Sequence, residues 1–428
     1  MNLASLDFSK KQKRMVIFAV TLGNLLEWYE LYLFVYWAPI IAELFFDSNS
    51  EYVNLTYTFL IFGMGFLARP LGGVFFGRLG DRIGRRKSML LSMLMMTVPT
   101  FITGLLPTQA MIGSLAPILL GFMRLFQSFP AGGEHPGASC YPYENSKVQN
   151  RRFMSSWGAF GFQVGILIST VECFFLEKYL PYEDLITWGW RLSFIVGGLI
   201  GLCGLFLRYR LHETPLYREM LSHEQIVKEP LLEVVQRYWK KMLLGVGFCA
   251  LNSSAFYLLT VNLPVYFGKI LGISYKDNLI ITMFLLILIT VPLPLFGKLA
   301  DRFDNQKMLV ASTIGIILLL YPIYFTINHP SLVLMGVLIL IFSLFFTFLS
   351  ALIPYLLSDL FPTHARFTCV GISFNVVDAL IGGFTPVVAL YLLHLTGQQG
   401  AFCWFLLFCA LLSLGSYLAM KEKHPPHL

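Results

Sequence analysis

The chain has 428 residues, of which 56% are apolar and only 13% are charged, and its formal net charge is +7. An ordinary soluble domain carries roughly 25% charged residues, so this composition excludes a soluble enzyme, a disordered chain and a nucleic-acid-binding domain. It indicates a protein that crosses the membrane many times. The seven cysteines have no CxxC spacing, so neither a disulfide framework nor a zinc site is predicted.

Twelve apolar segments follow one another along the chain, separated by short polar breaks. Each is long enough to cross a bilayer core, which takes about 20 helical residues. They occupy residues 15–43, 53–78, 88–106, 110–137, 152–176, 189–209, 241–268, 278–299, 308–328, 331–357, 367–394 and 400–420. The sequence therefore predicts an all-α membrane protein with twelve transmembrane helices and no extramembrane domain.

The connections between these segments alternate in their content of Lys and Arg. One set, which includes the N-terminus and the loops at 78–87 and 298–307, is rich in basic residues. The alternate set carries only Lys178, Arg191, Lys269 and Lys276. Because basic loops stay in the cytoplasm, we expect both termini to be cytoplasmic. The expected location is the plasma membrane, as a multi-pass protein of a bacterial inner membrane.

A long polar connection divides the spans six and six. We expect an N-terminal six-helix bundle at 1–209, a cytoplasmic linker at 210–240 and a C-terminal six-helix bundle at 241–428. The loop after the second span reads GRLGDRIGRRK, and the loop after the eighth reads GKLADRFDNQK. Glu144 and Arg151 after the fourth span repeat as Asp359 and Arg366 after the tenth. The two halves are therefore internal repeats.

The repeated loops carry ordered Gly and Asp as well as basic residues. Glycine lets helices approach closely, Asp suits the positive N-terminus of a helix, and the cations meet carboxylates or lipid phosphates. A loop that only sets orientation would explain the basic residues but not the Gly and Asp. We therefore expect a conformational latch made of Gly77, Asp81, Arg82, Gly84, Arg85, Arg86, Glu144, Arg151, Asp301, Arg302, Asp359 and Arg366.

The loops and the count of twelve spans resemble the major facilitator superfamily. Shorter segments resemble its metabolite:proton symporter family, which includes proline/betaine, citrate, oxoglutarate and shikimate permeases. These segments are GNLLEWY at 23–29, RPLGG at 69–73, RLFQ at 124–127, GGE at 132–134, WGWR at 188–191, ETP at 213–215, FPT at 361–363 and GGFTP at 382–386.

The resemblance implies two pseudo-symmetric six-helix bundles around a cavity lined by spans 1, 4, 7 and 10. It also implies proton-coupled uptake of a small polar metabolite by alternating access, such as a zwitterionic amino acid, a betaine or an organic acid. A proton-driven exporter and a transport-inactive sensor on the same fold are the alternatives. We expect a monomer that contacts membrane lipids and binds protons and a small-molecule substrate, with no nucleic-acid partner.

Ionisable residues inside the predicted spans are candidates for proton coupling, because they are costly at bilayer depth. Glu27 and Glu30 share a face of the first span, and Arg124 lies in a stripe with Gln127 and Glu134 on the fourth. We expect Arg124 to pair with Glu27 or Glu30, and a proton to neutralise the surplus acid. A static pair that holds two helices together is the alternative.

Glu30, which stands where the resembled family has Asp, is our first candidate for the proton carrier, and Glu27 is the second. Asp378 and Glu134 are further candidates, although Asp378 also suits a polar contact between helices. The predicted substrate-binding residues are Arg124, Gln127, Trp28, Tyr29, Tyr32, Asn252, Tyr257 and Asn375. Their aromatic rings suit a cationic or zwitterionic ligand, or simply helix packing. The sequence has no Walker loop, GxSxG elbow or metal-spaced cluster, so we expect no enzyme, no catalytic residue, no metal and no cofactor besides the coupling proton.

Overall fold

The computed structural model describes residues 10–48, 50–222, 231–269, 272–328 and 331–420, and the regular structure of these residues is entirely helical. Nine of the described helical segments are long and apolar enough to cross a membrane. The helices α1, α4 and α6 complete the predicted twelve spans. They are less apolar because they carry the charged and polar side chains that were singled out in the sequence.

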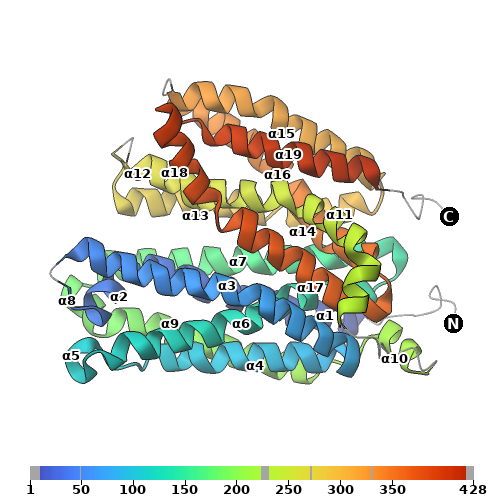
Figure 1. The fold of residues 1–428 in the computed structure, drawn as a ribbon, viewed down its shortest axis with the longest axis horizontal. Helices are drawn as coiled ribbons and strands as arrows, with labels where there is room; N and C mark the ends of the chain where they lie inside the picture. The colour runs from blue at the N-terminus through green and yellow to red at the C-terminus, as the bar shows by residue number, and fades with distance from the viewer. Residues whose placement is uncertain (1–9, 49, 223–230, 270–271, 329–330, 421–428) are drawn as a thin grey trace.

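The first group of helices comes from the N-terminal half and lies in the lower part of Figure 1. Its long members are α1 (Lys10–Tyr36), α3 (Glu51–Ile83), α4 (Arg85–Thr103), α6 (Leu115–Glu144), α7 (Arg151–Tyr179) and α9 (Trp190–Tyr209). Short elements join them: α2 (Ala38–Phe45), α5 (Gln109–Ile112), η2 (Val148–Asn150), α8 (Tyr182–Asp184) and η3 (Leu185–Gly189).

The second group comes from the C-terminal half and lies in the upper part of Figure 1. Its elements are α11 (Leu231–Tyr257), η4 (Leu258–Asn262), α12 (Leu263–Lys269), α13 (Tyr275–Thr290), α14 (Leu293–Ala300), α15 (Asn305–Asn328), α16 (Leu332–Leu360), η5 (Thr363–Ala365), α17 (Arg366–Val377), η6 (Asp378–Gly382), α18 (Thr385–Thr396) and α19 (Phe402–Ala419). Several spans are interrupted. In two of them, the π-helical segments η4 and η6 join α-helical parts.

The predicted linker at 210–240 is only partly loop. It contains α10 (Pro215–Ser222), and α11 begins at Leu231, ten residues before the expected start of the seventh span. Polar residues such as Gln236 and Arg237 continue this helix beyond the apolar segment. Residues 223–230 lie outside the described residues. The division into three parts at 209 and 240 stays a prediction.

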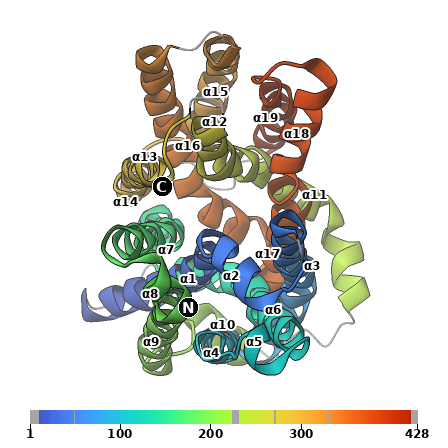
Figure 2. The same cartoon turned by 90° about the vertical axis from the view of Figure 1, so that its left-hand side faces the viewer.

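The two groups meet along two seams, one between α3 and α17 and the other between α7 and the helices α13, α14 and α16. Figure 2 shows both seams end-on. Glycine makes the first seam close, because a Cβ at Gly73 would lie 2.7 Å from Nδ2 of Asn375 and 2.8 Å from the carbonyl oxygen of Gly371. Any side chain at Gly73 would therefore push α3 and α17 apart.

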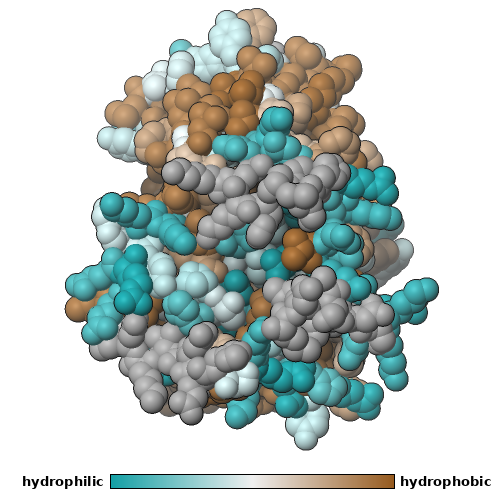
Figure 3. Space-filling model, turned by 90° about the vertical axis from the view of Figure 1, so that its right-hand side faces the viewer, coloured by the Kyte–Doolittle hydropathy of each residue, from teal (hydrophilic) through white to brown (hydrophobic). Residues whose placement is uncertain are grey.

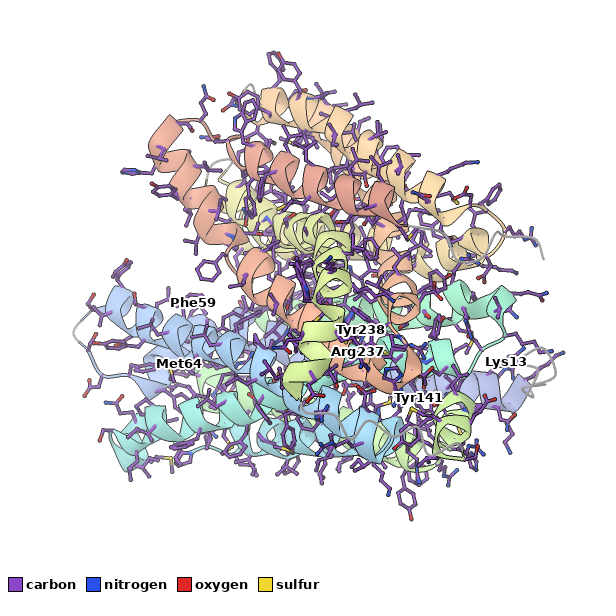
Figure 4. All side chains as sticks on the ribbon, turned by 45° about the vertical axis from the view of Figure 1, so that its right-hand side comes forward. Lys13, Phe59, Met64, Tyr141, Arg237 and Tyr238 are labelled. Atoms are coloured by element: carbon purple, nitrogen blue, oxygen red, sulfur yellow. The ribbon has the colours of Figure 1, made fainter. Side chains whose placement is uncertain are left out.

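The two ends of the described chain lie at the same end of the molecule, which we call the terminal face (Figure 1). Figure 3 views this face and shows hydrophilic side chains over its middle and lower parts, whereas hydrophobic side chains cover the upper helices. Figure 4 shows four labelled residues toward this face: Lys13, Tyr141, Arg237 and Tyr238. Phe59 and Met64, in the first half of α3, lie toward the other end of the molecule. We call the other end of the molecule the opposite face.

Candidate functional site

A cavity with about 560 Å³ of empty space, part of it open to solvent, lies between the two groups of helices. Helices α1, α6 and α7 form one wall, and α11, α16, α17 and η6 form the other. The lining residues are Asn24, Trp28, His135, Ser139, Gly158, Ala159, Phe162, Asn252, Ser253, Phe256, Ser350, Ile353, Pro354, Phe374 and Asp378. Both halves of the chain therefore contribute to a single site.

Aromatic rings form much of the cavity wall. Trp28 meets Phe162 edge-on with 4.0 Å between the ring centroids, and it meets Phe256 with 5.5 Å between them. The imidazole of His135 stacks parallel to Phe374 with a centroid distance of 3.3 Å. Because these contacts join α1 and α6 to α11 and α17, the aromatic wall crosses the interface between the two groups. Such a wall can shield a small ligand from water and can contact a ligand cation.

Three buried polar atoms along this wall have no hydrogen-bond partner among the described residues: Oδ1 of Asn24, Nε2 of His135 and Oγ of Ser139. The side-chain amide of Asn24 donates a hydrogen bond of 2.9 Å to the carbonyl oxygen of Gly158, and this bond fixes the orientation of the amide. Buried polar atoms without partners cost about 1–3 kcal/mol each. A polar ligand in the cavity would satisfy these atoms and remove that cost.

A buried ion triad lies beside the cavity and joins the two groups. Arg69 on α3 lies 3.2 Å from Oε1 of Glu27 on α1 and 3.2 Å from Oδ2 of Asp378 on η6. Ser253 donates to the other oxygen of Asp378 at 3.3 Å. A Cβ at Gly382 would lie 3.0 Å from this oxygen, so the glycine gives the carboxylate room to reach α11.

Arg124 was expected to pair with Glu27 or Glu30, and it forms an ion pair with Glu30 at 3.0 Å. Its guanidinium lies over the rings of Phe34 and Phe62. It also donates a hydrogen bond of 3.3 Å to Oε1 of Gln127. Arg124, Gln127 and Glu30 are not among the residues that line the 560 Å³ cavity. This pair therefore lies within the N-terminal group, away from the described cavity wall.

Glu134, another candidate for proton coupling, forms a separate buried ion pair with Arg208. Its carboxylate accepts from Nη1 of Arg208 at 2.9 Å and from the hydroxyl of Ser92 at 3.2 Å. Arg208 also donates to the carbonyl oxygens of Ala19 and Met89. The pair thus ties α1, α4, α6 and α9 together. Arg208 was not predicted as a partner, because a basic residue in the last turn of the sixth span is expected to face the cytoplasm.

Some of the other predicted substrate-binding residues line the cavity, and the rest form contacts between helices. Asn252 lines the cavity, as does Trp28, whereas Tyr29 donates to Glu172 and to the carbonyl oxygen of Ser193 within the N-terminal group. Asn375 donates to the carbonyl oxygens of Gly132 on α6 and Gly371 on its own helix, so it joins α17 to α6. Tyr257 is buried on α11, outside the described lining.

Tyr32 lies one turn after the cavity residue Trp28 on α1, toward the opposite face. Its hydroxyl donates a hydrogen bond of 2.8 Å to Oγ1 of Thr260 in η4, and this bond links α1 to the C-terminal group. A second hollow of about 290 Å³ lies beyond this bond, with Tyr36, Thr260 and Tyr275 among its lining residues. The bond between Tyr32 and Thr260 therefore separates the central cavity from this outer hollow.

At the terminal face, two aspartates cap helices of the other group. Asp81 on α3 accepts from the backbone amides of Phe367 and Thr368, at 3.2 and 2.9 Å, at the beginning of α17. Asp301 accepts from the backbone amides of Arg152 and Phe153, at 3.1 and 3.2 Å, at the beginning of α7. Burial raises the pKa of Asp301 to about 6, against the lowering effect of these hydrogen bonds. The two repeats therefore cap each other reciprocally.

Glu144 is the centre of a charged cluster at the same face. It accepts from Nε and Nη2 of Arg85 at 3.1 and 3.2 Å, from Arg366 at 2.6 Å and from the hydroxyl of Thr214 at 2.6 Å. Because Arg366 belongs to the C-terminal group, this cluster also spans the interface. Asp359 accepts from the hydroxyl of Tyr143 at 2.5 Å across the same interface.

The remaining predicted latch residues lie around these contacts. A Cβ at Gly77 would lie 2.7 Å from Cα of Thr368, so this glycine permits the close approach to α17, and Gly84 has a φ of +107°. The guanidinium of Arg86 donates to the carbonyl oxygen of Tyr209, and that of Arg151 donates to Tyr143. Arg82 and Arg302 are exposed.

The comparisons with known proteins agree with this architecture. The model of the Major Facilitator Superfamily matches residues 20–386. This chain belongs to the major facilitator superfamily. It is therefore a multi-pass membrane transporter, and not an enzyme.

Relatives of known name cover most of the chain. The chain is 31% identical over 418 residues to a glycine betaine/proline/ectoine/pipecolic acid transporter, OusA, of Dickeya dadantii, covering 96% of this chain and 83% of that protein. It is 32% identical over 400 residues to a citrate-proton symporter of Klebsiella pneumoniae, covering 93% of this chain and 89% of that protein. The solved structure of the proton:xylose symporter XylE bound to 6-bromo-6-deoxy-D-glucose superposes with a TM-score of 0.79 at 15% identity, covering 96% of this chain and 95% of that one. This likeness confirms the predicted fold of twelve helices in two six-helix bundles.

Proposed function

We propose that this chain is a secondary active transporter that takes up a small polar metabolite together with protons by alternating access. The observation that carries the proposal is the cavity between the two bundles, whose wall holds unpartnered polar atoms next to buried carboxylates. The names of the relatives, a betaine/proline transporter and a citrate-proton symporter, support proton-coupled movement of small metabolites.

The chemistry of the cavity favours a substrate that carries a carboxylate, such as a zwitterionic amino acid, a betaine or an organic acid. The hydroxyl of Ser139 and an N–H of His135 can donate to a carboxylate, and Oδ1 of Asn24 can accept from an ammonium or hydroxyl group. Trp28 and Asp378 are placed to contact a substrate cation. No cofactor is needed, because the proton is the coupling ion.

We propose further that the terminal face is cytoplasmic, in a bacterial inner membrane, and that the transporter acts as a monomer. The basic loops of the sequence and the hydrophilic surface of Figure 3 support this orientation. The reciprocal caps of Asp81 and Asp301 and the cluster of Glu144 hold the bundles together at that face. They are the conformational latch of a state that is closed to the cytoplasm, and they must release before substrate leaves inward.

Reconstituted protein tests the proposal. Proteoliposomes with an alkaline interior are given labelled proline, glycine betaine or citrate outside, and the expected result is accumulation that an uncoupler abolishes. Accumulation driven by an inverted gradient would instead indicate an exporter. Binding of these compounds without flux would indicate a sensor and would contradict the proposal.

A further inference from the structure

The buried ion pairs beside the cavity differ in their charge balance. Arg124 pairs with Glu30 alone, and Arg208 pairs with Glu134 alone. Arg69 instead serves two carboxylates, Glu27 and Asp378. Among the described residues, the first two pairs are therefore neutral, whereas the triad carries one negative charge in excess.

An excess carboxylate in this environment is expensive. Arg69, Glu27 and Asp378 are 2%, 3% and 4% exposed, so water does not solvate the surplus charge. An uncompensated buried charge costs several kcal/mol, and a bound proton removes it. Of the three groups of ion pairs near the cavity, the triad is therefore stabilised most by binding a proton.

Within the triad, the two carboxylates are held unequally. Asp378 accepts hydrogen bonds from Arg69 and from Ser253. Glu27 lies 3.2 Å from Nη2 of Arg69 without the geometry of a hydrogen bond, and its Oε2 has no partner among the described residues. A proton on Oε2 of Glu27 would therefore break no existing hydrogen bond.

Resting on the proton-coupled transport proposed above, we propose that the Glu27–Arg69–Asp378 triad is the proton-binding site of the transport cycle, and that Glu27, rather than Glu30, takes the proton. The proton comes from water on one side of the membrane and forms an O–H bond at Oε2 of Glu27. It leaves to water on the other side, and no other covalent bond changes.

The position of the triad explains how proton and substrate are coupled. Asp378 lines the cavity, and the guanidinium of Arg69 lies 5.3 Å from the ring of Trp28, which also lines it. When Glu27 is neutral, the triad no longer repels a substrate carboxylate that enters the cavity. Proton and substrate then favour each other's binding, as symport requires. Because Arg69 and Asp378 belong to opposite bundles, the charge state also acts on the interface between them.

The other ionisable groups around the triad do not remove its excess charge. They are Glu30 with Arg124, Glu134 with Arg208, His135, Tyr32, Tyr257 and Cys249. Each of the two acids in this set has its own arginine. The excess therefore stays with Glu27 and Asp378.

A titration of proton uptake tests this assignment without a known substrate. The purified full-length protein is titrated in detergent from about pH 8 to about pH 5 with a pH-indicator dye. We expect Glu27→Gln to take up one proton fewer than the wild type, because one acid then faces one arginine. The matched control is the double variant Glu30→Gln with Arg124→Met, which removes a neutral pair on the same helix face and should keep the full uptake. Full uptake by Glu27→Gln, with loss in the control, would overturn the proposal.

Transport separates this inference from the proposed function. In the proteoliposome assay, Glu27→Gln should exchange labelled substrate but should not accumulate it under a pH gradient. Asp378→Asn serves as a second variant, since it also leaves one acid for Arg69, and it should lose the same proton. If the wild type accumulates none of the three compounds, the proposed function is wrong. If the wild type accumulates one of them and both variants still do so with unchanged pH dependence, only the triad assignment is wrong.

Discussion

Replacement of Glu134 by Gln should destabilise the protein strongly. Glu134 and Arg208 are both fully buried, and the carboxylate accepts from the guanidinium and from Ser92. The substitution leaves the charge of Arg208 without a counterion in the interior. Loss of one partner of a buried pair costs about 3–5 kcal/mol, which is a large part of the stability of most proteins.

The structure also predicts how the loss can be repaired. The double variant Glu134→Gln with Arg208→Gln removes both charges and leaves two amides that can bond each other. Replacing a whole buried pair is often nearly neutral. We therefore expect the double variant to be much closer to the wild type than either single variant.

Thermal unfolding of the detergent-purified protein measures this effect. Six of the seven cysteines are buried, so a dye that fluoresces on reacting with thiols reports unfolding. Both single variants should unfold at clearly lower temperatures, and the double variant should recover most of the difference. A double variant as unstable as the singles would refute the reasoning. Loss of gradient-driven accumulation in a folded double variant would support a role for Glu134 in proton coupling.

Three further predictions concern the latch and the cavity. Asp81→Ala removes both acceptors of the cap on α17, so it should weaken the closed state, slow transport and increase labelling of the buried Cys140 by a thiol reagent, with the substrate's affinity for this state unchanged. Burial raises the pKa of Asp301 to about 6, above its ordinary value of 3.8, so protonation of this group when the pH falls from about 7 to about 4 should favour the closed state by roughly 50-fold; the same labelling assay should show this, and Asp301→Asn should reduce it. Ser139→Ala should weaken substrate binding about tenfold, measured as a smaller thermal stabilisation by the substrate, because it removes one donor from the cavity wall.

The number of spans could be predicted from sequence because lipid tolerates few polar residues across about 20 positions. The ends of the helices were harder to predict. The second span was expected to end at 78, but α3 continues to Ile83, since its last turns pack against α17 instead of lipid. The π-helical segments η4 and η6 left no hydropathy signal, because a changed hydrogen-bond register does not alter composition.

The candidate site was only partly visible in the sequence. Helical spacing places Glu27 and Glu30 on one side of α1, but it does not say which arginine each one meets. That choice depends on how α1 is rotated against α3 and α6, and the result is Glu27 with Arg69 and Glu30 with Arg124. His135 was not among the predicted site residues, yet α6 continues through Pro136 and His135 lines the cavity. The roles assigned to these residues in transport stay predictions.

At each reciprocal cap one aspartate side chain supplies the acceptors. Asp81 and Asp301 supply the acceptors, but the donors that face them are mostly backbone amides, which every residue except proline provides. Substitutions at Phe367, Arg152 and Phe153 can therefore accumulate without loss of these bonds. Each bundle both gives and receives one cap, so the two bundles are joined at both seams of the terminal face. Over evolution, changes at these two acidic positions could tune how long the proposed closed state lasts.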